Sequence, residues 1–144
     1  MSKPKMSPEM NMTRYLLDSN HLSPLVTVGH PVRQLILERM GGGDSFAIPA
    51  PVLSEFLFGI GLLPHAPANQ TTWQELADTF GYYHVDRQDA EAAAELRLRL
   101  RRAGRQLPLI DALIAGVALR QGLTLLTTDA DFDAVPGLNK ESWW

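Results

Sequence analysis

Short apolar runs alternate along the chain with longer segments in which apolar residues recur every three or four positions. Apolar runs bounded by polar turns are typical of buried strands, whereas the wider spacing is typical of helices. The predicted strands cover residues 15–17, 45–48, 82–85 and 123–127, and residues 135–144 can add an edge strand. The predicted helices cover residues 31–40, 51–59, 72–80, 89–103 and 108–121.

Two of the predicted helices need more than periodicity for their assignment. Leucine and arginine alternate from Leu96 to Leu100, as they would in an exposed strand. Ala93, Leu96 and Leu100 nevertheless recur at helical spacing within a stretch rich in strong helix formers, which predicts a helix. For the helix over residues 72–80, Thr72 and Glu75 have the spacing of a capping box.

The predicted strands and helices follow one another in turn, so the fold class is α/β. Strands separated by helices form a parallel sheet, and such sheets are covered on both faces. We therefore expect a three-layer α/β/α fold with a central parallel sheet, in a single domain over residues 13–144. Residues 1–12 carry little apolar content and are predicted to form a disordered tail.

Composition and charge narrow the class of protein further. The 144 residues include 13 basic and 16 acidic side chains, and a net charge of −3 argues against nucleic-acid binding through bulk charge. A local basic patch remains compatible with that value. The absence of cysteine excludes disulfides and thiolate metal sites. Because no apolar run is long enough for a membrane span and residues 1–12 do not resemble a signal peptide, we expect a cytoplasmic protein without membrane association.

Four acidic residues occupy positions where an α/β fold binds ligands. Asp18 and Asp129 each follow an apolar strand, and such folds bind ligands at the carboxyl ends of their strands. Glu55 and Asp111 lie near the starts of helices that are expected to begin at the same edge. Each acid also has a plainer interpretation as a helix cap or turn residue, which we favour for Glu55 and Asp129 taken singly. Asp111 fits it least, because it follows Pro108 by three residues inside an apolar run.

The four acids taken together indicate a metal site. Several carboxylates placed close together repel one another, and a hard divalent cation removes that penalty. Oxygen ligands favour magnesium or manganese over zinc, and a magnesium site on a parallel sheet points to phosphoryl chemistry. The four histidines have no metal-ligand spacing, and each is predicted to lie at the surface or in a turn.

The segments around these acids resemble the PIN-domain nucleases, and more closely the VapC toxins of bacterial toxin–antitoxin pairs. They read YLLDSN at residues 15–20, VLSE at 52–55, LIDALIA at 109–115 and LLTTDADF at 125–132. The match follows the family order from residue 15 to residue 144. The resemblance implies a magnesium- or manganese-dependent endoribonuclease that cleaves transfer or ribosomal RNA. It also implies a homodimer and a cognate small antitoxin protein as partner.

The same resemblance implies roles for individual residues. The catalytic and metal-binding acids of the family map onto Asp18, Glu55, Asp111 and Asp129. Asn20 and Thr127 are expected to orient these acids by hydrogen bonding. Asp131 is an alternative to Asp129, and which of the two faces the metal is left open.

Three arginines recur at four-residue steps toward the end of one predicted helix, namely Arg97, Arg101 and Arg105. One interpretation is a solvated helix end whose positive charges complement the helix dipole. The other is an RNA-binding patch that contacts phosphates beside the acids. The spacing alone favours neither interpretation.

Other functions are weighed against a toxin nuclease. A phosphorylated aspartate is disfavoured, because the turn from Asp18 to Asn20 lacks a second acid and no lysine closely follows the last core strand. A PIN-domain nuclease that processes RNA without acting as a toxin, and a non-catalytic binding domain, both remain open. A failure of magnesium or manganese to stabilise the chain would favour the binding domain.

Overall fold

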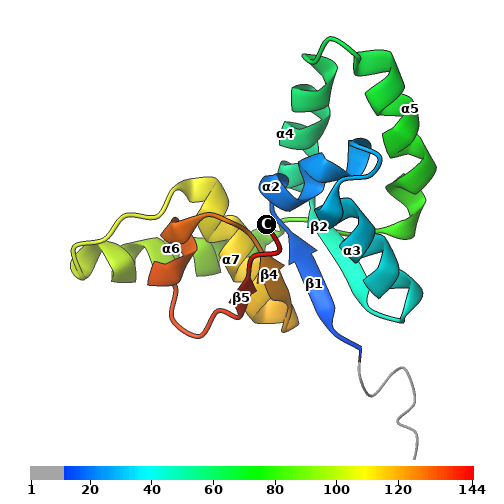
Figure 1. Cartoon of the computed structure of the whole chain (residues 1–144). Helices are drawn as coiled ribbons and strands as arrows, with labels where there is room; N and C mark the ends of the chain where they lie inside the picture. Colours follow the sequence, from blue (N-terminus) through cyan, green and yellow to red (C-terminus); the bar gives the residue numbers. More distant parts are fainter. Residues whose placement is uncertain (1–11) are drawn as a thin grey trace, which may run out of the picture.

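The computed structural model describes residues 12–144, and the centre of this part of the chain is a five-stranded parallel sheet (Figure 1). The strands are β1 (Arg14–Leu17), β2 (Ser45–Pro49), β3 (Gly81–Tyr83), β4 (Thr124–Leu126) and β5 (Lys140–Glu141). Their spatial order is β3-β2-β1-β4-β5, and neighbouring strands are parallel. The tail predicted over residues 1–12 lies outside the described residues apart from Met12.

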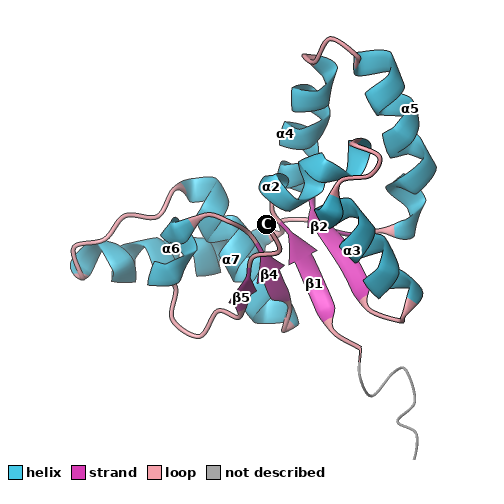
Figure 2. Ribbon diagram, in the orientation of Figure 1, coloured by secondary structure: helices cyan, strands magenta, loops and turns pink. Residues whose placement is uncertain are grey.

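Helices connect the strands and flank the sheet (Figure 2). The α-helices are α2 (Ser19–Leu22), α3 (Pro31–Gly41), α4 (Ala50–Gly61), α5 (Ala66–Leu76), α6 (Arg87–Arg102) and α7 (Leu109–Gln121). The short 3-10 helices are η1 (Ser23–Val26), η2 (Ala77–Thr79) and η3 (Ala130–Ala134). The chain moves outward from β1 to β2 and β3, and α6 and α7 then carry it back to β4. Because parallel crossovers are right-handed, these opposite directions place helices on both faces, and the predicted three-layer fold is confirmed.

The central strands β1 and β4 lie side by side, and their onward connections leave in opposite directions along the sheet. In α/β sheets such a switch point opens a crevice at the carboxyl ends of the strands, where ligands bind. The register pairs Leu17 with Leu126. Asp18 and Thr127, which follow these two residues, therefore come together at the crevice.

The apolar runs of the central strands form the middle of the core. Leu16 in β1 and Leu125 in β4 are fully buried, because helices cover both faces of the sheet at these strands. Helix α6 packs against α7 and buries Ala93, Leu96 and Leu100. The helix predicted over the alternating leucine–arginine segment is therefore confirmed.

Two elements differ from the sequence predictions. Helix α5 begins at Ala66, well before the predicted start, so the capping box assigned to Thr72 is wrong. Pro67 lies in the first turn, where proline is tolerated because the N–H that it lacks would have no helical partner. The polar turn predicted after β1 is instead the start of the short helix α2, with Asp18 as its N-cap.

The C-terminal segment forms the predicted edge strand β5 and then folds back over the sheet. Trp143 packs edge-on against Tyr15 and Phe46, with ring centroids 4.9 Å and 5.8 Å apart. Figure 1 shows the C-terminus beside the ends of the central strands. Within residues 12–144, the helices are too short or too polar to cross a membrane.

Candidate metal centre

Four carboxylates from separate elements meet at the carboxyl edge of the sheet. Asp18 caps α2, Asp129 caps η3, and Asp111 lies in the first turn of α7. Glu55 comes from α4, and all four side chains line one open cavity of about 420 Å³. The structure therefore brings together the four acids that were selected from the sequence.

Asp18 is buried and its carboxylate accepts three hydrogen bonds. Oδ1 accepts from the backbone N–H of Ser19 at 2.8 Å, and Oδ2 accepts from Thr127 Oγ1 at 2.7 Å. Asn20 Nδ2 donates to the same Oδ2 at 3.3 Å. The Thr127 hydroxyl also accepts from the backbone N–H of Asp129 at 3.0 Å, so it links two of the acids. These contacts fix the direction in which Asp18 presents its remaining lone pairs, and they involve both residues that were expected to orient the acids.

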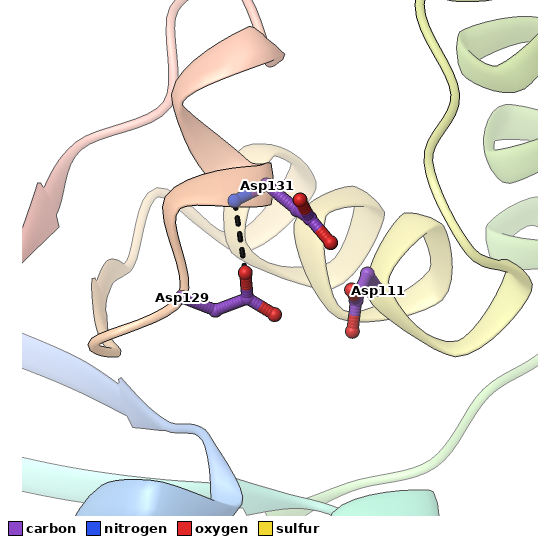
Figure 3. Close-up of side chains that lie close together, drawn as sticks. All are labelled: Asp111, Asp129 and Asp131. Atoms are coloured by element: carbon purple, nitrogen blue, oxygen red, sulfur yellow. Dashed lines mark hydrogen bonds between the residues drawn. The ribbon is translucent and has the colours of Figure 1, made fainter.

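Asp111, Asp129 and Asp131 form the tightest part of the acidic cluster (Figure 3). One carboxylate oxygen from each of them lies within 4.8 Å of the other two. Asp129 is half-buried and lines the cavity, whereas Asp131 is exposed. The backbone N–H of Asp131 donates to Asp129 Oδ1 at 2.8 Å. Both residues lie close to Asp111, and each therefore presents an oxygen that can share a cation with it.

The electrostatics of the cavity are dominated by like charges. Burial raises the pKa of Asp111 to about 6, and the carboxylates of Asp129, Asp18, Asp131 and Glu55 add to the rise. Among the described residues that line the cavity there is no lysine, arginine or histidine to offset these charges. The donor set is made of hard oxygen atoms, which suits a divalent cation such as magnesium or manganese.

Glu55 lies at the rim of the cavity. Its side chain is exposed, and it belongs to the second turn of α4 instead of the opening turn. Besides the acidic cavity, Glu55 lines a neighbouring groove of about 540 Å³ together with Phe56, Ile60 and Trp144. This acid is therefore the member of the set most accessible to water and to a ligand in the groove.

His21 is a residue next to the site that the sequence predictions misplaced. His65 and His84 are exposed, as predicted, but His21 in α2 is fully buried. Burial lowers the pKa of His21 to about 4, so its imidazole is neutral at pH 7. Its ring nitrogens contact Asn20 Oδ1 and the backbone nitrogen of Trp143. The second partner is remote in sequence, so no local pattern around His21 indicates its burial.

The three arginines selected from the sequence lie along one groove. Arg97, Arg101 and Arg105 line a cavity of about 590 Å³ beside α6. Pro108 lines both this groove and the acidic cavity, so the two are adjacent. Arg97 Nε also donates to the backbone carbonyl of Leu107 at 3.1 Å, which ties this arginine to the loop before α7.

The chain combines a parallel sheet with acids gathered at its switch point, and comparison with known proteins shows which family has this arrangement. The PIN-domain family model matches residues 15–138. This chain belongs to the PIN-domain family, as its sequence segments indicated. The chain is also similar to ribonuclease VapC4 from Mycobacterium tuberculosis, with 30% identity over 129 residues. That alignment covers 88% of this chain and 95% of VapC4.

Solved structures of toxin–antitoxin proteins share the fold. The chain resembles a chain of VapBC2 from Rickettsia felis, solved with a fragment of promoter DNA, with a TM-score of 0.79 and 23% identity. The match covers 92% of this chain and 100% of that one. A toxin–antitoxin complex from Klebsiella pneumoniae matches with a TM-score of 0.66 and 26% identity, over 86% of this chain and 94% of that chain. The resemblance to VapC toxins is thereby confirmed.

Proposed function

We propose that this protein is a divalent-metal-dependent endoribonuclease of the VapC type and the toxin of a type II toxin–antitoxin pair. The observation that carries the proposal is the gathering of four carboxylates in one cavity at the switch point, with no positive side chain among the described residues that line it. Similarity to a VapC ribonuclease over most of the chain supports the same activity.

The proposed metal ligands are Asp18, Asp111 and Asp129, with Glu55 completing the site and Asp131 as an alternative to Asp129. Magnesium or manganese, when bound, would polarise a phosphodiester and lower the pKa of an attacking water. Asp18 is held in place by Thr127 and Asn20, which preorganises one side of the site. Glu55, exposed at the rim, would accept the proton of the attacking water, and solvent in the open cavity would protonate the departing 3′ oxygen of the RNA.

The RNA backbone is proposed to enter along the groove of Arg97, Arg101 and Arg105. This groove adjoins the acidic cavity at Pro108, so phosphates held by the arginines would continue toward the carboxylates. Guanidinium groups bind phosphates through paired, charge-assisted hydrogen bonds. A basic groove next to an acidic cavity reconciles an RNA substrate with a net charge of −3.

A cognate antitoxin is the proposed protein partner. Toxin–antitoxin complexes are among the solved structures that share this fold. Phe58 and Leu62 are about 70% exposed near the end of α4, the helix whose residues Glu55 and Ile60 line the neighbouring groove. An apolar surface of this kind favours a protein contact, and a basic antitoxin side chain would be attracted to the neighbouring acids. A homodimer and a cytoplasmic location complete the proposal.

The decisive experiment compares RNA cleavage by the unchanged chain and by Asp18→Asn and Asp111→Asn, with manganese, with magnesium and with excess chelator. We expect both substitutions and the chelator to lower the cleavage rate at least about 100-fold, because each removes a metal ligand or the metal itself. Asp78→Asn, an exposed change on η2, is the matched control and should cleave normally. Undiminished cleavage by both site variants would overturn the proposal.

Toxicity is tested separately from cleavage. Expression of the unchanged chain should arrest growth, expression of Asp111→Asn should not, and co-expression of the neighbouring gene product should relieve the arrest. Cleavage without growth arrest would identify an RNA-processing nuclease. Absence of both cleavage and stabilisation by manganese would favour a non-catalytic binding domain.

A further inference from the structure

A chain of hydrogen bonds connects the C-terminal segment to the candidate metal ligand Asp18. The backbone N–H of Trp143 donates to His21 Nε2 at 2.9 Å, and His21 Nδ1 lies 2.7 Å from Asn20 Oδ1. Asn20 Nδ2 then donates to Asp18 Oδ2. Residues more than 120 positions apart are thus joined through one buried imidazole.

Two backbone N–H groups determine the direction of every bond in this chain. The N–H of Trp143 can only donate, so His21 Nε2 must accept and the ring proton must lie on Nδ1. That proton is donated to Asn20 Oδ1, which also accepts from the backbone N–H of Thr128 at 3.1 Å. With its oxygen fixed by two donors, Asn20 must turn its NH₂ group toward Asp18.

The surroundings of His21 favour this one arrangement. The side chain is fully buried in α2, and burial keeps the imidazole neutral at pH 7. A side chain that only filled space would leave the Trp143 N–H without this acceptor and would remove one of the two donors to Asn20. Trp144 makes a second contact between the C-terminal segment and Asn20, because its Nε1 donates to the backbone carbonyl of Asn20 at 2.8 Å.

We propose that His21 is a positioning residue: held by the Trp143 backbone, it sets the orientation of the Asn20 amide and thereby the direction of the Asp18 carboxylate toward a divalent cation. The inference rests on the proposed metal site. His21 itself has no role in the chemistry, because Asn20 stands between it and the carboxylate. Groups that orient metal ligands in this way commonly change metal affinity by 10- to 100-fold when removed.

The test measures manganese affinity by calorimetric titration of the full chain, for which activity is not required. His21→Phe fills the space but lacks both ring nitrogens, and we expect about a tenfold loss of affinity. His21→Asn keeps an NH₂ group near the position of Nδ1 and should recover affinity to within about threefold of the unchanged chain. His84→Phe, at an exposed position, is the matched control and should bind like the unchanged chain.

The outcomes separate this inference from the proposed function. Unchanged affinity in His21→Phe, or no recovery in His21→Asn, overturns the positioning role alone. No manganese binding by the unchanged chain overturns the proposed function and the inference with it. If His21→Phe does not fold, nitrogen NMR of the unchanged chain decides: a protonated Nδ1 and an unprotonated Nε2 support the inference, and the opposite tautomer overturns it.

Discussion

Asp111 is partly buried among other acids, and its protonation links the site to stability. The pKa of Asp111 is raised to about 6 in the folded chain, against 3.8 for an unperturbed aspartate, first by burial and then by neighbouring carboxylates. Between these values the folded state binds more protons than the unfolded state. The free energy of unfolding therefore falls as pH rises from about 4 to 6, and the loss persists above that range.

We predict that Asp111→Asn stabilises the metal-free chain at pH 7.5. After allowance for solvent screening of this half-buried group, the expected gain in the free energy of unfolding is about 1 kcal/mol. The gain should shrink toward zero below pH 4, where the native carboxyl is already protonated. Urea unfolding with chelator at both pH values measures the difference. An equal effect at the two values would mean that ionisation of Asp111 is not its cause.

Single residues of the site differed in how far the sequence predicted them. Asp18 and Asp129 were accessible to prediction because Asp18 directly follows one apolar strand and Asp129 lies just beyond the end of another, and strand ends are where α/β folds place their ligands. Asp111 was indicated because it is an acid within an otherwise apolar helix. His21 could not be predicted, because its burial depends on the backbone of Trp143 and on a fold-back of the C-terminal segment. Local sequence contains no signal for a contact of that range.

At the scale of elements, α6 and the loop that follows it present different arginines to two grooves. Arg101 and Arg105 line the groove that adjoins the acidic cavity, whereas Arg99 and Arg102 line another groove of the same helix region. Replacing either pair with alanine removes the same charge. A difference in RNA binding between the two double variants therefore reports the position of the arginines and not the net charge.

We predict that Arg101→Ala with Arg105→Ala weakens RNA binding and reduces the magnitude of the slope of log K against log salt by about 1.4, because two phosphate contacts are lost. Arg99→Ala with Arg102→Ala, the matched control, should leave the slope nearly unchanged. Fluorescence anisotropy of a labelled RNA over a range of salt concentrations measures both. Equal slopes for the two double variants would favour a solvated helix end over an RNA-binding groove. Arg97 is left intact because its bond to Leu107 has a structural role.

The packing of α6 on α7 depends on a largely buried ion pair. Asp89, in the capping box that begins α6, is 4% exposed and forms an ion pair with Arg120 at the end of α7. We predict that Arg120→Ala lowers the melting temperature by roughly 5 °C or more, because Asp89 is left buried without its partner. Arg87→Ala, which breaks the exposed pair with Glu91, should change it by less than about 1 °C. Thermal unfolding followed by circular dichroism distinguishes the two; equal changes would contradict the prediction.

Elements with strong, simple patterns were predicted well, and those that depend on tertiary context were not. The apolar runs of β1, β2 and β4 and the long periodic helices α6 and α7 lie where the sequence indicated. The start of α5 was missed because proline and polar residues normally indicate a loop, although proline is compatible with a first helical turn. The four-residue helix α2 was missed because it is too short to show a period.

For the whole molecule, the net charge of −3 describes neither the acidic cavity nor the basic groove beside it. The acids gather in one cavity, and three arginines line the adjoining groove. Opposite charges kept apart in this way would guide the proposed RNA substrate to the edge of the site, and the proposed metal ion would offset repulsion within it. The net charge argues only against RNA binding through attraction to the molecule as a whole. The fold determines which surfaces can attract RNA locally.

The pairing of β1 with β4 also has a consequence for the order in which the chain folds. Asp18 and Thr127 are 109 residues apart in sequence, so their contact closes a loop that contains most of the chain. Contacts over such separations form slowly, because a large loss of chain entropy precedes any gain. A folding intermediate with β1, β2 and β3 assembled would hold Asp18 and Glu55 without Asp111 or Asp129. The proposed nuclease activity would then emerge only with the final long-range pairing, and an incompletely folded chain would leave RNA intact.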